Sequence, residues 1–285
     1  MTLPPFDLHH AGTVEEVTDL FDRYGEDAAV YCGGTELLLL LKLGFASYGH
    51  LIDIKQLAEL GGITIENDMV LVGAAVTHRE LERSAIVSDR LPALAEMERR
   101  VANLRVRNVG TLGGNLCFSD PHSDPATFLL ALDATVECLQ GATRRTLALS
   151  EFVVGPYQTA LRPGELLGKI RIPLPPAGTG IAHKKLSFHE RPAATVTVAA
   201  ERRAGVFTQV RIAVGSVGAR PIRAHEAERM LVDTDAASHR PRDEAAAAAA
   251  LAADAVNDSN GSADYKTHLV KVLVRRCLDE AAQAE

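Results

Sequence analysis

Two glycine-pair loops, each beside apolar sequence, constrain this chain more than any other feature. The first is Cys32-Gly33-Gly34-Thr35-Glu36 and the second is Thr111-Leu112-Gly113-Gly114-Asn115. Glycine permits unusual backbone dihedrals and lets N–H groups approach a ligand closely, and successive exposed N–H groups bind phosphate oxygens. Together the loops predict a diphosphate-containing cofactor that is held from both sides. Either loop taken alone could also be an ordinary turn.

The composition is typical of a globular chain and excludes some classes of partner. With 285 residues the chain can form two domains with a sizeable core, and its formal net charge is −7 at pH 7. Its arginines are scattered, so the sequence has no basic stripe for nucleic acid. The longest apolar run, Leu37 to Leu41, is too short to span a bilayer, and the N-terminus does not resemble a signal peptide. We expect a cytoplasmic protein that binds neither nucleic acid nor membrane.

The first half of the chain alternates between helix and strand patterns. Thr13 and Glu16 form a capping box, which predicts that a helix begins there. Apolar spacing predicts further helices at 37–43, 90–101 and 126–132. Buried or β-branched runs predict strands at 28–32, 51–54, 135–139 and 170–172, and a hairpin over 63–72. We expect two α+β subdomains, at about 1–57 and 58–175, that together bind the cofactor.

A dense cluster of structure breakers, Pro173 to Gly178, predicts a domain boundary. Beyond it, 195–201 and 209–217 have the pattern of paired strands, with Arg203-Ala204-Gly205 as the turn. Helices are predicted at 244–256 and 264–282, the second capped by Ser262. The chain is therefore expected to be α+β, with domains at 1–175 and 176–285, the second being a small antiparallel sheet with helices.

Common cofactor and catalytic motifs do not fit the sequence. It lacks the Gly-x-Gly-x-x-Gly dinucleotide loop, a Gly-Lys-Ser/Thr phosphate loop, a Gly-x-Ser-x-Gly elbow and a His-Glu-x-x-His zinc motif. His122 is interpreted as a loop histidine without a catalytic role. The cysteines have no Cys-x-x-Cys spacing, which predicts free thiols and no metal site; they are Cys32, Cys117, Cys138 and Cys277.

The segment from Val106 to Asn115, followed by Asp120-Pro121-His122-Ser123-Asp124, resembles the flavin-binding medium subunits of molybdenum hydroxylases. These subunits include the xanthine dehydrogenase and aerobic carbon monoxide dehydrogenase families. Further stretches resemble this family in the same order, at 33–38, 129–134, 215–221 and 261–276. The resemblance implies a two-subdomain FAD-binding fold of the vanillyl-alcohol-oxidase/PCMH type, followed by the C-terminal domain of the medium subunit.

The resemblance also implies which residues bind FAD. They are Cys32, Gly33, Gly34, Thr35, Glu36, Leu37, Ala102, Gly110, Thr111, Gly113, Gly114, Asn115, Asp124, Leu167 and Lys184. Both glycine loops would hold the diphosphate and ribityl oxygens through backbone N–H groups and hydroxyls. Asp124 would accept from a ribityl hydroxyl and Leu167 would pack against the flavin. Lys184 would lie near the polar edge of the ring, although Lys184-Lys185 leaves the register open by one residue.

Several of these positions have a second interpretation. Asp124 could cap a helix that begins at Pro125. Thr77-His78 occupies the place of a Thr-His pair that relatives have near the cofactor, or Thr77 could be a helix cap. Relatives also place an aromatic residue near the flavin after the lysine segment, where this chain has Arg191-Pro192-Ala193-Ala194. The flavin would therefore be covered differently here, or exposed to its electron acceptor.

The function implied is electron transfer. In complexes of this family a molybdopterin cofactor in a large subunit hydroxylates the substrate, and electrons pass through two [2Fe–2S] clusters of a small subunit to FAD and then to an external acceptor. The resemblance implies a dimer of such heterotrimers, with no catalytic side chain and no metal in this chain. Two alternatives stay open: a stand-alone FAD-dependent oxidoreductase of the same fold, and a binding protein that has lost its flavin. The sequence identifies neither the substrate nor the acceptor.

Overall fold

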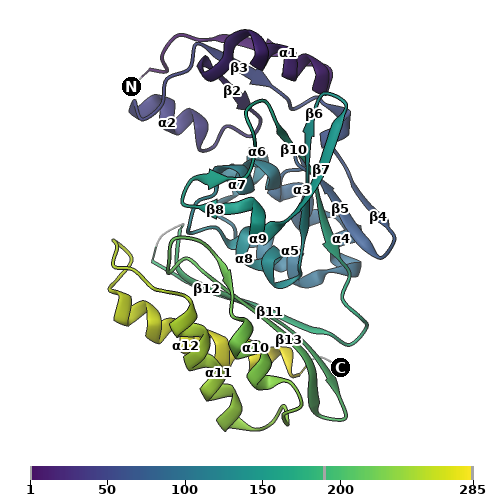
Figure 1. The fold of residues 1–285 in the computed structure, drawn as a ribbon, viewed down its shortest axis with the longest axis vertical. Coiled ribbons are helices and arrows are strands. Elements are labelled where there is room, and N and C mark those ends of the chain that lie inside the picture. Colours follow the sequence, from purple (N-terminus) through teal and green to yellow (C-terminus); the bar gives the residue numbers. More distant parts are fainter. Residues whose placement is uncertain (1, 189–190, 284–285) are drawn as a thin grey trace.

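The structure, a computed structural model, describes residues 2–188 and 191–283 of the chain. Three units, each with its own sheet of three or more strands, follow one another along the long axis of the molecule (Figure 1). The N-terminal unit lies at one end, the five-stranded sheet and its helices lie in the middle, and the C-terminal unit lies at the other end (Figure 1). None of the helices in the described ranges is long and apolar enough to cross a membrane.

The N-terminal unit is a small parallel sheet with two helical connections. Its strands, in the order β1-β3-β2, are β1 Asp7–His10, β2 Ala28–Tyr31 and β3 His50–Asp53. The connections contain α1 Val14–Tyr24, α2 Leu37–Leu43 and a 3₁₀ turn at Gly25–Asp27. A second 3₁₀ turn, Ala58–Leu60, leads out of the unit. The first glycine pair directly follows β2 and therefore lies at the carboxyl edge of this sheet, where ligands commonly bind.

The middle unit is built on an antiparallel sheet in the order β4-β5-β10-β6-β7. Its strands are β4 Ile63–Glu66, β5 Met69–Gly73, β6 Thr135–Gln140, β7 Thr143–Ala148 and β10 Leu166–Pro173. Asn67 and Asp68 join β4 to β5 with positive φ angles of 49° and 58°, the geometry of a tight hairpin turn. Two short strands, β8 Val153–Gly155 and β9 Gln158–Thr159, form a separate ribbon.

Short capped helices fill the space beside this sheet. They are α3 His78–Arg83, α4 Ala85–Arg90, α5 Pro92–Arg99, α6 Leu104–Val109, α7 Leu112–Phe118, α8 Asp124–Ala131 and α9 Leu149–Phe152. Polar side chains accept from backbone N–H groups at the start of most of them, as the four free N–H groups of a helix start require. α8 is buried along its whole length and lies between the middle sheet and the C-terminal unit.

The C-terminal unit is an antiparallel sheet with helices packed on one face. The strands, in the order β11-β12-β13-β14, are β11 Gly180–Ser187, β12 Pro192–Arg203, β13 Val206–Gly215 and β14 Ile222–Arg223. The helices are α10 His225–Leu231, α11 His239–Ala252 and α12 Ala263–Ala281. Alternate residues of β12 serve two cores: Val196 and Val198 pack with the C-terminal helices, whereas Thr195 hydrogen-bonds Thr127 of α8 at 3.1 Å.

Most of the longer elements expected from the sequence are confirmed. The helix at Leu37–Leu43, the hairpin over 63–72, the paired strands around the 203–205 turn and the Ser262 cap all occur as expected. The alanine-rich helix was expected to start at residue 244 but begins at His239 and ends at Ala252. The helix expected at 90–101 is divided, because Leu91 interrupts it and Pro92 begins α5.

Candidate functional site

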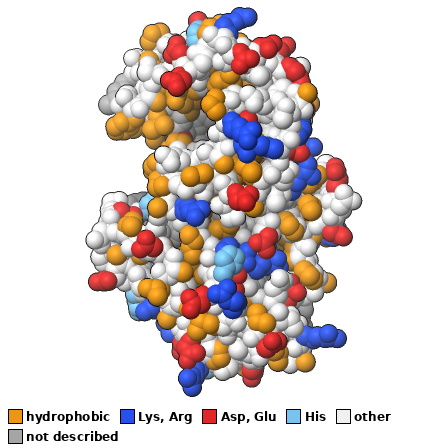
Figure 2. Space-filling view, in the orientation of Figure 1, with side chains coloured by type: hydrophobic (Ala, Val, Ile, Leu, Met, Phe, Trp, Pro, Cys, Tyr) orange, Lys and Arg blue, Asp and Glu red, His pale blue; other side chains and the backbone are white. Residues whose placement is uncertain are grey.

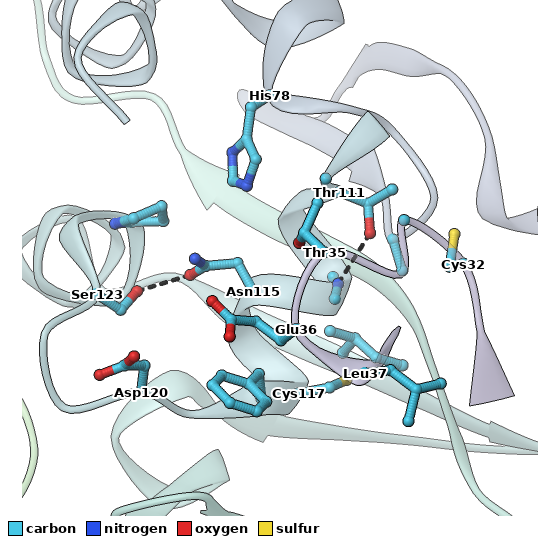
Figure 3. Close-up of a pocket in the computed structure, with 18 of the residues that line it drawn as sticks. Cys32, Thr35, Glu36, Leu37, His78, Thr111, Asn115, Cys117, Asp120 and Ser123 are labelled. Atoms are coloured by element: carbon cyan, nitrogen blue, oxygen red, sulfur yellow. Dashed lines mark hydrogen bonds between the residues drawn. The ribbon is translucent and has the colours of Figure 1, made fainter. Parts of the chain in front are cut away.

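A cavity of about 360 Å³ lies where the three units meet. Its wall combines the loop after β2, the starts of α3, α7 and α8, the end of α6, the beginning of β10 and the residues that open β12. Every residue that the resemblance assigns to FAD lines this wall except Lys184. Figure 3 shows labelled side chains from both glycine loops and from the α7–α8 region surrounding one space.

The first glycine loop offers free amides to this space. Within the described chain, the backbone N–H groups of Gly34, Thr35 and Glu36 donate to no protein group. Gly34 has a φ of 71°, and a Cβ there would lie 2.5 Å from the ring of Tyr31, so only glycine fits. Unpaired amides that line a cavity need an acceptor, and a phosphate is the strongest acceptor available to them.

The backbone amides of the second glycine loop have different hydrogen-bond partners from those expected. The N–H groups of Leu112 and Gly113 donate to the carbonyls of Val76 and Ala74 at 3.0 Å each. The N–H of Gly114 donates to the Thr111 hydroxyl oxygen at 3.0 Å, which caps α7. These amides are therefore occupied by protein acceptors, and the expectation that they hold the diphosphate is corrected.

The glycines of the second loop are needed for packing. A Cβ at Gly113 would lie 2.5 Å from the Cβ of Ala74, so α7 can approach β5 only with glycine there. The side chains next to them remain directed to the cavity: Thr111 has its hydroxyl hydrogen, and Asn115 accepts from Ser123 Oγ at 2.6 Å (Figure 3). This loop therefore presents side-chain groups to the cavity, rather than backbone amides.

The lysine register is one residue later than predicted. Neighbouring residues of a strand point to opposite faces, and in β11 Lys184 points to α12, where it pairs with Glu280. Lys185 points the other way and places Nζ 2.5 Å from Asp124 Oδ2 and 2.6 Å from the Arg100 carbonyl oxygen. The expectation for Lys184 is therefore corrected: this residue lies away from the cavity, and Lys185 is the lysine that contacts its wall.

Asp124 is a buried carboxylate with spare acceptor capacity. Its exposed fraction is 5%, and Oδ1 makes no hydrogen bond to a described residue, although His183 Nε2 lies 3.7 Å away. Ser123, not Asp124, caps α8, because Ser123 Oγ accepts from the Ala126 N–H at 3.3 Å. The capping interpretation of Asp124 is therefore wrong, and the residue is part of the cavity wall instead.

Arg191 lies in the segment where the family resemblance implied an aromatic residue near the flavin. Its Nη2 lies 3.2 Å from both carboxylate oxygens of Glu36, and its Nε lies 3.1 Å from Asp120 Oδ2. The side chain therefore joins the C-terminal unit to the first glycine loop and to the segment after α7. Arg191 and Pro192 both line the cavity, so the C-terminal unit completes its wall.

Two histidines line the cavity. Each contacts a carboxylate that the sequence did not predict as its partner. His78, at the start of α3, has Nδ1 2.7 Å from Glu98 Oε2. His122 Nδ1 donates to the Pro192 carbonyl at 2.8 Å, and Nε2 lies 3.5 Å from Asp258 Oδ2. No sequence pattern could have shown these pairs, because their partners lie far along the chain.

Asp258 is ionised behind His122. Burial opposes its ionisation, but the Lys266 ammonium, the Asn260 N–H and His122 together hold the pKa of Asp258 below its ordinary value. Thr77 caps α3 through a capping box with Glu80, so the cap interpretation holds while His78 still lines the cavity.

The rest of the wall is apolar or chemically unreactive. Leu37, Leu166 and Leu167 contribute aliphatic surface, and Ala102 lines the cavity with a φ of 42°. Burial raises the pKa of Cys32 and raises that of Cys117 to about 12, so both remain thiols at neutral pH. All four cysteines are free, and in the described ranges no group of three or more His, Cys, Asp or Glu side chains could hold a metal ion.

The wall therefore fits an organic cofactor with an anionic part, a hydroxylated part and an apolar ring. Free amides, a carboxylate residue and an aliphatic surface occur in the wall of one cavity at the junction of two subdomains. Fold and site together define the class of α+β flavin-binding domains that hold a dinucleotide between subdomains.

Comparison with known proteins agrees with this class. The family described as "FAD binding domain in molybdopterin dehydrogenase" matches residues 4–175, and "CO dehydrogenase flavoprotein C-terminal domain" matches residues 182–281. The carbon monoxide dehydrogenase medium chain of Hydrogenophaga pseudoflava is 35% identical over 285 residues, covering 99% of this chain and 98% of the relative. The 6-hydroxypseudooxynicotine dehydrogenase complex subunit alpha of Paenarthrobacter nicotinovorans is 33% identical, covering 99% and 96%.

A solved structure extends the agreement to three dimensions. A chain of carbon monoxide dehydrogenase from Hydrogenophaga pseudoflava matches with a TM-score of 0.95 at 35% identity, covering 99% of this chain and 98% of that one. The chain belongs to the family of FAD-binding medium subunits of molybdenum hydroxylases. It is an oxidoreductase subunit with an α+β FAD-binding domain followed by the C-terminal domain of that family.

Proposed function

We propose that the chain holds FAD in the cavity between its units and passes electrons from the [2Fe–2S] clusters of a small subunit to an external acceptor. One observation carries the proposal: the free amides of Gly34, Thr35 and Glu36 belong to the wall of a cavity that also contains the carboxylate residue Asp124. A diphosphate and a ribityl chain need these two kinds of partner. The FAD-binding residues are then the predicted set without Lys184.

The roles of the chain's own groups follow from their chemistry. The three amides would bind diphosphate oxygens, Asp124 would accept from a ribityl hydroxyl, and Leu167 would pack against the ring system. The bound flavin would supply the redox chemistry, because it exchanges electrons singly and in pairs. Lys185 would fix the position of the Asp124 side chain through its contact with Oδ2.

The partners are proposed from the names of the relatives. A "medium chain" and a "subunit alpha" of a dehydrogenase complex are parts of larger assemblies. We propose that a small iron–sulfur subunit and a large molybdopterin subunit join this chain in the cytoplasm, as a dimer of heterotrimers. Relatives of similar identity are named for carbon monoxide and for a nicotine derivative, which supports a substrate site outside this chain.

We also propose that the flavin-binding domain spans 1–175, with subdomains divided near residue 57, and that the second domain spans 176–285. The matched family ranges support this division, as does the passage of the chain from β10 to a separate sheet after Pro173. Figure 2 supports the absence of a nucleic-acid partner, because acidic and basic side chains are interspersed over the face that it shows.

The test is the absorption spectrum and metal content of the protein purified from its native host. Flavin bands together with iron–sulfur absorption and molybdenum are expected. A clean flavin spectrum from an active single chain would favour the stand-alone oxidoreductase instead. A colourless protein that does not take up added FAD would contradict both readings.

A glycine variant tests the cavity directly. Gly34→Val is expected to abolish FAD binding, because its Cβ would meet Tyr31 in the loop that carries the free amides. Gly44→Val is the matched control: Gly44 has a similar φ of 75°, and a Cβ there would meet nothing within 4 Å. Equal loss of FAD in the two variants would mean that left-handed strain, and not the loop, is responsible.

A further inference from the structure

One ion pair spans the solvent-exposed edge of the cavity. Arg191, which directly precedes β12 of the C-terminal unit, places Nη2 3.2 Å from both carboxylate oxygens of Glu36, in the first glycine loop of the N-terminal unit. Both residues line the cavity, and their side chains are 50% and 34% exposed. The pair therefore joins the first and last units of the chain at a place where the cavity meets solvent.

The Arg191 end of this ion pair is firmly anchored. Its Nε lies 3.1 Å from Oδ2 of Asp120, a carboxylate whose side chain is only 10% exposed. The next residue, Pro192, has a backbone φ that its ring restricts, and its carbonyl accepts from His122 Nδ1 at 2.8 Å. Asp120 and His122 belong to the segment between α7 and α8, so the middle unit holds the guanidinium in place.

The Glu36 end belongs to a more weakly packed segment. α2, the helix that follows the first glycine loop, buries one of its seven residues, Leu41. The hydrophobic core of the N-terminal unit includes Leu139 and Leu166 of the middle sheet, but no described residue of the C-terminal unit. A segment with few buried apolar contacts opens at a low cost in free energy. Residues 33–43 are therefore the part of the wall that can move, and Arg191 ties them to the C-terminal unit.

We propose that Arg191 is a latch on the first glycine loop: while it holds Glu36 the cavity is closed, and its release lets FAD enter and leave. This inference rests on the proposed function, because it needs FAD in this cavity. Such a latch acts on the opening equilibrium of the empty protein and of the loaded protein alike. It therefore controls the rate of FAD exchange more than the affinity, and it gives the C-terminal unit control over the cofactor.

The experiment mixes apo-protein with FAD in a stopped-flow instrument and follows flavin fluorescence at several FAD concentrations, which gives the association and dissociation rate constants separately. Arg191→Met and Glu36→Gln are each expected to raise both rate constants by about threefold to thirtyfold, as for the loss of a partly exposed, charge-assisted contact. The Kd for FAD should change by less than about threefold. Glu36→Gln should add nothing in the Arg191→Met background, because the two side chains form one contact.

Asp133→Asn is the matched control. Asp133 also forms ion pairs between units, with Arg211 and Arg223 of the C-terminal unit, but it does not belong to the described wall of this cavity. Its side chain is 57% exposed and its φ of 53° suits asparagine. The variant should therefore fold and leave both rate constants unchanged. A change as large as that in Glu36→Gln would overturn the latch, since any contact between units would then have the same effect.

The two rate constants also distinguish a latch from a direct contact with FAD. If Arg191 bound FAD itself, Arg191→Met would raise the dissociation rate constant alone, and Glu36→Gln would release the arginine to the ligand and tighten binding. That pattern, or unchanged rate constants in both single variants, would overturn the inference. Glu36→Gln keeps the size of the side chain and decides the question if Arg191→Met does not fold. Failure of the wild-type protein to bind FAD would instead remove the proposed function.

Discussion

Gly113 lines the proposed FAD cavity, and packing alone already requires glycine at this position. Because a Cβ there would lie 2.5 Å from Ala74 Cβ, Gly113→Ala is expected to lower the free energy of unfolding of the apo-protein by about 1–3 kcal/mol. Urea unfolding without FAD measures this. Gly61→Ala, where the nearest atom would be 3.7 Å away, should cost less than Gly113→Ala. A Gly113→Ala protein of normal stability that binds FAD poorly would show that the residue acts on the ligand.

Glu165 links stability to pH at the edge of the cavity. Its hydrogen bonds with Arg145, at 2.7 and 2.6 Å, hold the pKa of Glu165 below its ordinary value of 4.5. A carboxylate with a lowered folded-state pKa stabilises above its ordinary pKa, and this contribution is lost as pH falls through the folded-state value. Glu165→Gln should therefore destabilise by about 1–3 kcal/mol at pH 7, and the difference should shrink below pH 4.5.

The control for Glu165 is the carboxylate that pairs with the neighbouring arginine of β7. Glu59 pairs with Arg144, the neighbour of Arg145, but its side chain is 49% exposed. Glu59→Gln should change the free energy of unfolding by less than about 1 kcal/mol. If the two variants lose the same stability, or if the effect of Glu165→Gln is independent of pH, the ion pair is not the cause.

At single residues, the sequence located the site better than it assigned roles. The glycine pairs and the family resemblance pointed to the glycines, Asn115 and Asp124, and the structure brings these residues to one cavity. They could not show that the Gly113 N–H is taken by Ala74, nor which of Lys184 and Lys185 faces Asp124. Those facts depend on which strand face meets which helix, and that is fixed by tertiary packing.

At the scale of elements, Lys185 connects β11 to the middle unit through polar contacts. This side chain contacts Asp124 at the start of α8 and the carbonyl of Arg100 after α5. Lys185→Met would leave Asp124 buried without a cation, and we expect it to lower the free energy of unfolding by about 3–5 kcal/mol. Lys184→Met, on the opposite strand face, should cost less than about 1 kcal/mol, because Glu280 is 55% exposed. Chemical denaturation of both variants checks this, and the reverse order would contradict the strand assignment.

Elements with a sustained apolar period were predictable, and the six-residue helices were not. α12 and the β12–β13 pair carry enough periodicity to be recognised. α3, α4 and α6 have six residues each, too few for an apolar period. The position of α6 depends on a cap, Asn103, which looks like an ordinary loop residue in the sequence.

At the scale of the whole molecule, three separate hydrophobic cores surround one cofactor cavity. We expect apo-protein to unfold in more than one calorimetric step, since small cores behave as separate cooperative units. FAD at a hundred times its Kd should add about 2.7 kcal/mol and bring the steps together. NAD at the same concentration is the control and should change neither. One sharp transition without FAD would show that the cores already act as one.

The architecture of the molecule could be predicted only in part from the sequence. Breaker residues from Pro173 to Gly178 marked where one sheet ends, but nothing local showed that β12 packs Thr195 against Thr127 of α8. The contribution of Arg191 to the cavity was also hidden, because its partners Glu36 and Asp120 belong to earlier units. Contacts between distant segments are the part of a fold that a single sequence reveals least.

The position of Arg191 and Pro192 in the cavity wall has a consequence for biosynthesis. During translation the flavin-binding loops leave the ribosome long before these two residues, so an incomplete chain has an open cavity. The cavity wall is therefore complete only when the last third of the chain has been made and folded. We expect a chain that ends before Arg191 to bind FAD more weakly than the full chain.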